Sequence, residues 1–339
     1  MGAGHPSQAD CRRGVRAALA GLPAGSLALA AVSGGADSLA LAAALAAEAP
    51  AHDVTAGAII VDHQLQEESA DVALLAAQHC ADLGLAPVAV VPTLVTASGE
   101  GLEAAAREAR YAALAETAEA MASSLGTGQT TALVLLGHTR DDQAEQVLLG
   151  LARGSGARSL AGMAVLVVRE GTPFARPLLH LPRATTRRAC EEWGLTPWED
   201  PMNSDPAHAR VRVRQALADL EGDLGPGLAE ALARSADLLR DDADLLDELA
   251  AQATPDDDPA DGVAVTDLEG LASALRSRVW RRLLLRAGAP AGGLTAGHVA
   301  ACDRLVTDWH GQGPLHLPGD LRVRRDRDRV HIARAPGGQ

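Results

Sequence analysis

A glycine-rich turn between an apolar run and a helix-forming stretch holds the first residues that could do chemistry. Ser33-Gly34-Gly35-Ala36-Asp37-Ser38 follows the run Leu27–Val32 and precedes a stretch rich in alanine and leucine. Paired glycines let the backbone turn tightly, and the free N–H groups at a helix start favour phosphate. Asp37 would repel phosphate unless Mg²⁺ bridged the two. The pattern predicts a nucleotide phosphate site, with a glycine turn and a capping serine as the alternative.

Two further polar groups follow apolar runs. Asp62 and His63 come directly after Ala56–Val61, and His138 comes shortly after Ala132–Leu136. Because the carboxyl ends of parallel strands meet at one edge of a sheet, we expect these side chains beside the phosphate turn. A helix-capping aspartate and a surface histidine would explain Asp62 and His63 equally well.

Asp142 and Glu145 form a pair of carboxylates in the segment DDQAEQ. They are three residues apart, so they share one face of a helix near its positive end. Such a pair could bind Mg²⁺, or hold an amine and accept its proton. Acidic residues also occur at helix starts for dipole reasons alone.

Several arginines could hold anions. Arg107 and Arg110 share a helix face in GLEAAAREARY and could bind phosphate or transition-state charge. A solvated helix with Glu103–Arg107 pairs is the alternative. Arg210 opens a series with Arg212 and Arg214, which could contact nucleic acid phosphates or clamp a carboxylate.

Alternating strands and helices must position these groups. The strands are predicted at Leu27–Val32, Ala56–Val61, Pro87–Val91 and Ala132–Leu136. The helices are predicted at Ser38–Ala49, Glu68–Leu83, Gly101–Leu125 and Asp141–Ala152. This order predicts an α/β fold with a parallel sheet, helices on both faces and a ligand at the carboxyl ends of the strands.

A smaller, mostly helical C-terminal domain is predicted beyond this sheet. Helices are expected at Ala207–Leu220, Gly227–Ala251, Leu268–Ala287 and Thr295–Trp309, and hairpin strands within Gly313–Arg334. The acidic segment TPDDDPADG reads as a linker. The predicted divisions are residues 1–220, a helical connector with the acidic linker at 221–262, and 263–339.

Composition excludes several classes of protein. All 30 cationic side chains are arginine, so the chain has neither a Schiff-base lysine nor a GxxxxGK[ST] phosphate loop. Four scattered cysteines form no CxxC motif, which argues against a disulfide scaffold or thiolate metal site. The sequence has neither a signal-peptide layout nor a long apolar span, so we expect a cytoplasmic protein with no membrane contact.

Net charge complicates the choice of partner. A charge of −14 opposes binding to nucleic acid, because affinity for a polyanion comes largely from cationic side chains. Acidic residues concentrate within 221–261, however, whereas arginines cluster in 183–188, 210–214, 276–286 and 322–329. A basic face on an acidic protein is therefore compatible with this sequence.

The ordered segments resemble a known family. SGGADS resembles the phosphate-binding signature of the PP-loop N-type ATP pyrophosphatases, whose domain is adenine nucleotide alpha hydrolase-like. VDHQL, AREARY, the block GHTRDDQAEQ…RGSG…GM and RPLL…WEDPMN…RVRVR resemble segments of the tRNA(Ile)-lysidine synthetases within that family. Gln146 stands where threonine is usual, Met202 where serine is usual, and Val211 where asparagine is usual. The resemblance covers residues 27 to about 220.

The resemblance implies a tRNA-modifying ligase that adenylates a cytidine of tRNA(Ile) with a CAU anticodon and then attaches free L-lysine. It implies ATP and Mg²⁺ as cofactors, Mg²⁺ ligands at Asp37 and Asp142, and catalytic residues Asp37, Asp142, Glu145 and Arg210. It implies ATP-binding residues Ser33, Gly34, Gly35, Ala36, Asp37, Ser38, Asp62, His63, Arg107, Arg110 and His138. A homodimer stays open. The alternatives are a tRNA cytidine thiolase of the same fold, whose relatives use cysteine pairs, and a non-catalytic nucleotide-binding module.

Overall fold

Two compact units make up the chain. The computed structural model describes residues 5–64, 68–93, 102–125, 131–154, 156–199 and 209–335. The first unit comprises Met1–Ala152 with Gly162–Ala236, and the second comprises Arg153–Ala161 with Asp237–Gln339. Helix α9 (Leu228–Ala253) runs from the first unit into the second.

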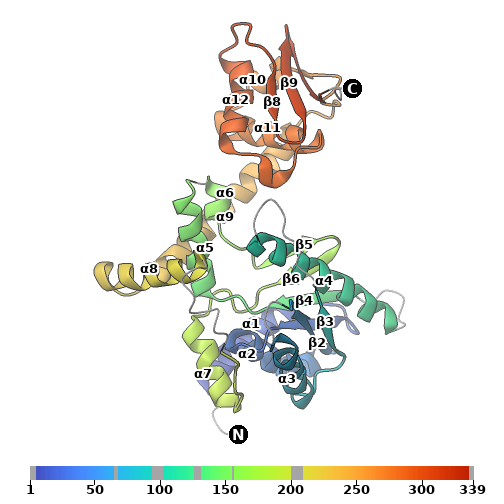
Figure 1. Cartoon of the computed structure of the whole chain (residues 1–339), viewed down its shortest axis with the longest axis vertical. Helices are drawn as coiled ribbons and strands as arrows, with labels where there is room; N and C mark the ends of the chain where they lie inside the picture. The colour runs from blue at the N-terminus through green and yellow to red at the C-terminus, as the bar shows by residue number, and fades with distance from the viewer. Residues whose placement is uncertain are drawn as a thin grey trace. The chain divides into compact units, whose positions relative to one another are not determined.

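A six-stranded sheet forms the centre of the first unit (Figure 1). Its strand order is β3-β2-β1-β4-β6-β5, and every neighbouring pair is parallel except the edge pair β5 and β6. The strands are β1 (Leu27–Val32), β2 (Thr55–Asp62), β3 (Val88–Pro92), β4 (Ala132–Leu136), β5 (Leu166–Arg169) and β6 (Thr172–Ala175). Strand β1 is apolar throughout and almost wholly buried, as expected for a central parallel strand covered on both faces.

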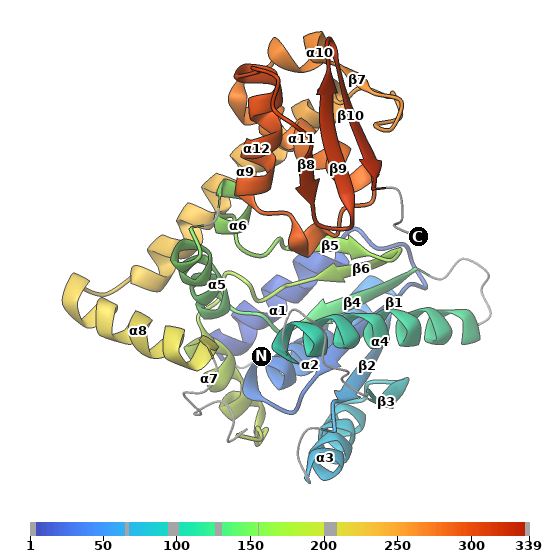
Figure 2. The same ribbon diagram turned by 45° about the horizontal axis from the view of Figure 1, so that its top comes forward.

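Helices cover both faces of this sheet (Figure 2). Helices α1 (Pro6–Leu19), α2 (Ala36–Glu48) and α3 (Ser69–Asp82) pack against one face in a core of alanine, leucine and valine side chains. Helix α4 (Leu102–Ser124) covers the opposite face, where Tyr111 and Leu114 pack with Leu29 and Phe174. The remaining helices of this unit are α5 (Arg140–Ala152), α7 (Arg183–Trp193) and α8 (Ala209–Leu224).

The second unit has its own core. A four-stranded antiparallel sheet in the order β7-β10-β9-β8 packs with three helices around the buried Trp280. Its strands are β7 (Val263–Ala264), β8 (Leu315–Leu317), β9 (Leu321–Asp326) and β10 (Arg329–Arg334). Its helices are α6 (Ala157–Leu160), α10 (Val265–Glu269), α11 (Ser273–Arg286) and α12 (Ala296–Thr307), besides the end of α9.

The structure confirms the predicted strands and the helices that alternate with them, with ends shifted by a few residues. The prediction of one helix at Leu268–Ala287 is wrong, because the chain breaks at Gly270 between α10 and α11. Sequence analysis did not predict the helices α1 and α7 or the strands β5, β6 and β7. None of the helices in the described part of the chain is long and apolar enough to cross a membrane.

Candidate active site

The glycine-rich turn joins β1 to α2 at the carboxyl edge of the sheet. Gly34 has a φ of +83°, a left-handed conformation that suits glycine. The Ser33 N–H donates to Ser38 Oγ at 3.1 Å, and Ser38 Oγ donates to the Gly35 carbonyl at 2.9 Å. These bonds fold the turn so that α2 begins at Ala36 with its N–H groups beside the turn, an arrangement that favours an anion.

Strand β4 ends against this turn. A Cβ atom added at Gly137 would lie 3.1 Å from the Asp37 carbonyl carbon, the Asp37 carbonyl oxygen and the Ser38 nitrogen. Glycine therefore permits a close approach of the two backbones. The approach brings His138, the next residue, to the same edge of the sheet as Asp37.

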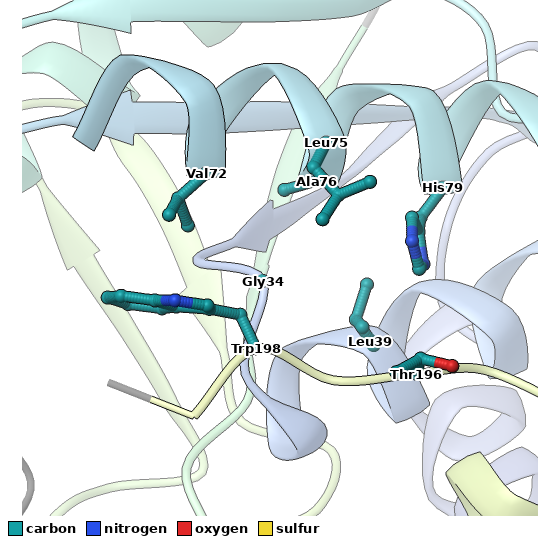
Figure 3. Close-up of a pocket in the computed structure, with 8 residues that line it drawn as sticks. All are labelled: Gly34, Leu39, Val72, Leu75, Ala76, His79, Thr196 and Trp198. Carbon is teal, nitrogen blue, oxygen red and sulfur yellow. The ribbon is translucent and has the colours of Figure 1, made fainter. Parts of the chain in front are cut away.

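The segment after α7 closes the other side of the turn. The Trp198 N–H donates to the Gly34 carbonyl at 3.0 Å. Figure 3 shows the Trp198 ring beside Val72 of α3, around a small pocket that Gly34 and Ala76 also line. Trp198 is thus a packing residue that fixes the glycine-rich turn. Asp200, Pro201, Met202 and Asn203 of the same motif lie outside the described residues.

Four carboxylates gather beside the turn, and we call them the acidic half of the site: Asp37, Asp141, Asp142 and Glu145. Asp37 belongs to the first turn of α2, and the other three belong to the start of α5. Asp142 Oδ2 accepts the Thr139 N–H at 2.7 Å and the Thr139 hydroxyl at 2.8 Å. These bonds cap α5 and fix the Asp142 side chain.

Arg183, which sequence analysis did not single out as a site residue, lies among these carboxylates. Its Nη2 donates to Asp142 Oδ1 at 2.6 Å and its Nη1 donates to Glu145 Oε1 at 3.2 Å. Its Nε lies 3.5 Å from Asp37 Oδ2. Glu145 Oε1 also accepts from Arg214 Nε at 3.0 Å. Two guanidinium groups therefore compensate part of the acidic half.

Thr186 is a second residue that the sequence analysis missed. Its side chain is fully buried, and its hydroxyl donates to Asp37 Oδ1. The Arg183 N–H donates to Asp141 Oδ2 at 2.8 Å. Arg183 and Thr186 are three residues apart in α7, so the first turn of this helix faces the acidic half. No helix was predicted there, so the sequence analysis had no basis for placing these two side chains on one face.

Asp37 and Asp142 of the acidic half have pKa values shifted in opposite directions. Burial raises the pKa of Asp37, and the negative charge of Asp142 adds to this, whereas Thr186 and Arg183 oppose it. Burial would also raise the pKa of Asp142, but Arg183, His138 and the Thr139 donors outweigh it and hold that pKa below its ordinary value. Asp142 is therefore a firmly ionised group and a weak base.

Cationic and imidazole side chains form the basic half of the site: His63, Arg107, Arg110, His138, Arg176 and Arg210. Burial lowers the pKa of Arg110, and the positive charges of Arg107 and Arg210 lower it further. Arg110 has no ion pair or hydrogen bond within the described residues. Arg107 and Arg176 point to Tyr111 Oη, which accepts from them at 3.4 and 2.9 Å. Arg107, Arg110 and Arg210 are thus like charges held close together.

Both histidines of the basic half are neutral near pH 7. Burial lowers the pKa of His138 to about 3, with Arg176, Arg110 and Arg107 opposing the attraction of Asp142. Burial and then Arg110 also lower the pKa of His63. The Nδ1 atom of each ring is buried and has no hydrogen-bond partner in the described part of the chain. His138 lies where the two halves meet, because Asp142 raises its pKa and the arginines of the basic half lower it.

Asp62 has a structural contact. Its side chain is buried, and Oδ1 accepts the Gln64 N–H at 2.9 Å where Gln64 has a positive φ. Asp62 therefore shapes the turn that follows β2 and carries His63 toward Arg110. Asp62 does not cap a helix, because α3 begins only at Ser69, and a role of Asp62 toward nucleotide stays a proposal.

The acidic half fits a magnesium ion in one way only. No group of three His, Cys, Asp or Glu residues could hold a metal by itself within the described ranges. Mg²⁺ is usually bound by one or two carboxylates together with substrate phosphates. Asp37, next to the anion-favouring turn and about a quarter exposed, suits that combination.

Comparison with known proteins gives two family matches. Residues 11–221 match the family described as PP-loop domain, and residues 264–331 match the family described as TilS substrate binding domain. The first match contains both halves of the site. The second match lies within the smaller unit.

Curated relatives match almost the whole chain. The chain is 52% identical over 332 residues to tRNA(Ile)-lysidine synthase of Thermobifida fusca, covering 97% of this chain and 98% of that protein. It is 51% identical to tRNA(Ile)-lysidine synthase of Streptomyces coelicolor, covering 92% of this chain and 86% of that protein. It is 48% identical to tRNA(Ile)-lysidine synthase of Salinispora tropica over the full length of both.

The fold is also found among solved structures. The U34-tRNA thiolase NcsA from Methanococcus maripaludis, with its [4Fe-4S] cluster, superposes with a TM-score of 0.52 at 19% identity. The match covers 69% of this chain and 79% of that chain. At this identity the likeness concerns the fold alone.

Proposed function

Because the chain belongs to the tRNA(Ile)-lysidine synthase family and matches both a PP-loop domain and a TilS substrate binding domain, we propose that it ligates L-lysine to C2 of cytidine 34 in the CAU anticodon of tRNA(Ile). The family is a family of ligases. The observation that supports this substrate set is the division of one sheet edge into an acidic half, suited to an amine and a cation, and a basic half, suited to phosphate.

The first proposed step forms an adenylated tRNA. The cytidine C2 oxygen attacks the α-phosphorus of ATP, the bond to the bridging oxygen of the β-phosphate breaks, and pyrophosphate leaves. The N–H groups of the turn from Ser33 to Ser38 hold the phosphates. Arg107, Arg110 and Arg210 balance negative charge that spreads over the phosphate oxygens in the transition state. Mg²⁺, held by Asp37, would draw electron density from the same oxygens.

The second proposed step joins lysine to the base. The amine attacks C2, the bond between C2 and the phosphate-bearing oxygen breaks, AMP leaves with that oxygen, and the amine releases its proton to solvent water. Glu145 and Asp142 attract the amine as an ammonium ion. We assign both an anchoring role, because each carboxylate already accepts hydrogen bonds from guanidinium groups that fix its position.

The remaining predicted site residues have supporting roles in this proposal. Arg210 lies close enough to Arg107 and Arg110 for its charge to lower their pKa values, so we place it on phosphate or on the lysine carboxylate. His63 and His138 offer neutral ring nitrogens to the adenine or ribose. Asp142 accepts three hydrogen bonds from Thr139 and Arg183 and so has fewer free lone pairs for Mg²⁺ than Asp37, and we assign it an effect on the ion through its charge.

The cysteines favour a ligase over a thiolase. Cys11, Cys80, Cys190 and Cys302 are all buried and free, and burial raises the pKa of each to about 12. Thiolate, the form that binds iron–sulfur clusters or carries sulfur, is therefore disfavoured at every one of them.

Purified protein would be incubated with Mg²⁺, ATP, labelled lysine and either tRNA(Ile) bearing CAU or the methionine tRNA. Label in the isoleucine tRNA alone, with AMP and pyrophosphate released, is the expected result. Pyrophosphate release without lysine transfer would contradict the substrate but keep the ATP chemistry. Absence of ATP turnover with functional tRNA would indicate a nucleotide-binding module.

A further inference from the structure

Arg183 is the most enclosed cation of the acidic half. Its side chain is 16% exposed, and its single guanidinium contacts carboxylates of two other helices. Three of its nitrogens face three different acids, at distances between 2.6 and 3.5 Å. Such a fork geometry is rigid, because a guanidinium is planar and directional. The packing of α7 against α2 and α5 therefore fixes the position of the Arg183 guanidinium between Asp37, Asp142 and Glu145.

Charge in the acidic half remains negative even with this guanidinium. Four carboxylates face the cations Arg183 and Arg214, so two negative charges are left in excess. Without Arg183 the excess would be larger and would centre on Asp37 and Asp142. Clustered carboxylates of this kind attract hard divalent cations, whose ligands are oxygen atoms.

Arg183 and a divalent cation make competing demands on the same carboxylates. A cation on Asp37 would be a close neighbour of the Arg183 Nε, which has the same sign of charge. Triphosphate brings the negative charge that offsets this repulsion and supplies the remaining oxygen ligands. A cation that arrives with ATP is thus favoured over a free one.

We propose that Arg183 is a positioning residue that keeps free divalent cations out of the acidic half, so that the metal is bound only together with ATP. The proposal rests on the proposed function in one respect, the assignment of the metal to Asp37. It gives Arg183 a role distinct from holding α7 in place. It also makes nucleotide, and not metal, the first ligand of the acidic half.

Mn²⁺ binding to the full chain tests this proposal without tRNA or lysine. The free Mn²⁺ signal in electron paramagnetic resonance would be titrated with protein, with and without the α,β-methylene analogue of ATP, and the signal lost to the analogue alone, which itself chelates Mn²⁺, would be subtracted. Wild type should bind Mn²⁺ at least about tenfold more tightly with the analogue than without it. Arg183→Gln, which keeps hydrogen-bond donors but loses the charge, should bind free Mn²⁺ about tenfold more tightly than wild type.

Two control variants separate charge from structure. Arg183→Lys keeps the positive charge and should bind free Mn²⁺ as weakly as wild type. Arg187→Met removes an exposed arginine of the same helix and should leave Mn²⁺ binding unchanged. Adding Asp37→Asn to Arg183→Gln should abolish the gained affinity.

The proposal is wrong if folded Arg183→Gln, checked by circular dichroism, binds free Mn²⁺ no better than wild type. It is equally wrong if wild type binds Mn²⁺ as tightly alone as with the analogue, a measurement that needs no variant to fold. Failure of lysine transfer in the ligation assay would leave these titrations interpretable, so the two proposals can fail separately.

Discussion

The acidic and basic halves of the site differ in how far neighbouring groups compensate their charges. Carboxylates of the acidic half are met inside the fold by two guanidinium groups and by the donors of Thr139 and Thr186. Arginines of the basic half repel one another, and two buried imidazole nitrogens near them have no described partner. Buried charge without compensation costs free energy of folding. In our proposal, the acidic half holds a small cation and the basic half holds an anion brought by the substrate.

The largest expected effect comes from the acidic half. Asp37→Asn should reduce pyrophosphate release by about 10³-fold, because it removes the charge that holds the cation beside the phosphates. The measurement is the rate of pyrophosphate release with saturating ATP and tRNA. Asp71→Asn, an exposed aspartate of α3, is the matched control and should behave as wild type. A loss of less than tenfold would remove Asp37 from the metal site.

Arg110→Met tests the basic half and should lower kcat/KM for adenylation by about 10²-fold. The same change should raise the free energy of unfolding by about 1 kcal/mol, because it removes a buried charge that its neighbours repel. Steady-state kinetics and chemical denaturation measure the two effects. A variant that lost both activity and stability would contradict the view that Arg110 is uncompensated.

Glu145→Gln should separate the two chemical steps. Lysine transfer should fall by about 30-fold, since a charge-assisted contact to the ammonium ion is lost. Pyrophosphate release should stay within about threefold of wild type, because the phosphate-binding turn is untouched. Both are followed in a single-turnover experiment with labelled lysine. Equal losses in both steps would argue that Glu145 only maintains the structure through Arg183 and Arg214.

The smallest expected effect is a shift in the pH dependence of pyrophosphate release. Asp37 must be ionised to hold a cation, and burial raises its pKa, so activity should fall as the pH drops through that raised pKa. Thr186 donates to Asp37 and opposes the rise. Thr186→Val should therefore move the acid limb of pyrophosphate release to higher pH and leave the rate at alkaline pH almost unchanged. Thr185→Val, in the same helix turn, should leave the limb in place.

Much of the sheet was predictable because its strands are short, apolar and separated by turn residues. Leu27–Val32 and Ala132–Leu136 were predicted to the residue, and the ends of parallel strands then placed Asp37 and His138 at one edge. The pair Asp142 and Glu145 was predictable from helical spacing alone. Local sequence patterns of this kind predict where buried strands and helices begin and end.

Arg183 and Thr186 could not be predicted from local pattern. Helix α7 reads RATTRRACEEW, with no bulky apolar side chain before Trp193, and it packs on α1 and α2 through Ala189 and Cys190. Alanine and cysteine blur the apolar period on which helix prediction depends. The partners of Arg183 are set by the packing of three helices, which no spacing in the sequence reveals. The separation of the site into an acidic and a basic half therefore arises from the tertiary structure.

The contact between Thr186 and Asp37 spans 149 residues of sequence, and the Trp198 bond to Gly34 spans a similar length. Synthesis proceeds from the N-terminus, so β1 and the glycine-rich turn leave the ribosome long before α7 exists. During that interval the nascent chain contains the complete nucleotide-binding motif without the segment that fixes its conformation. A chain truncated before residue 199 should carry the motif but should not retain ATP. We therefore expect nucleotide binding only late in the synthesis of this enzyme.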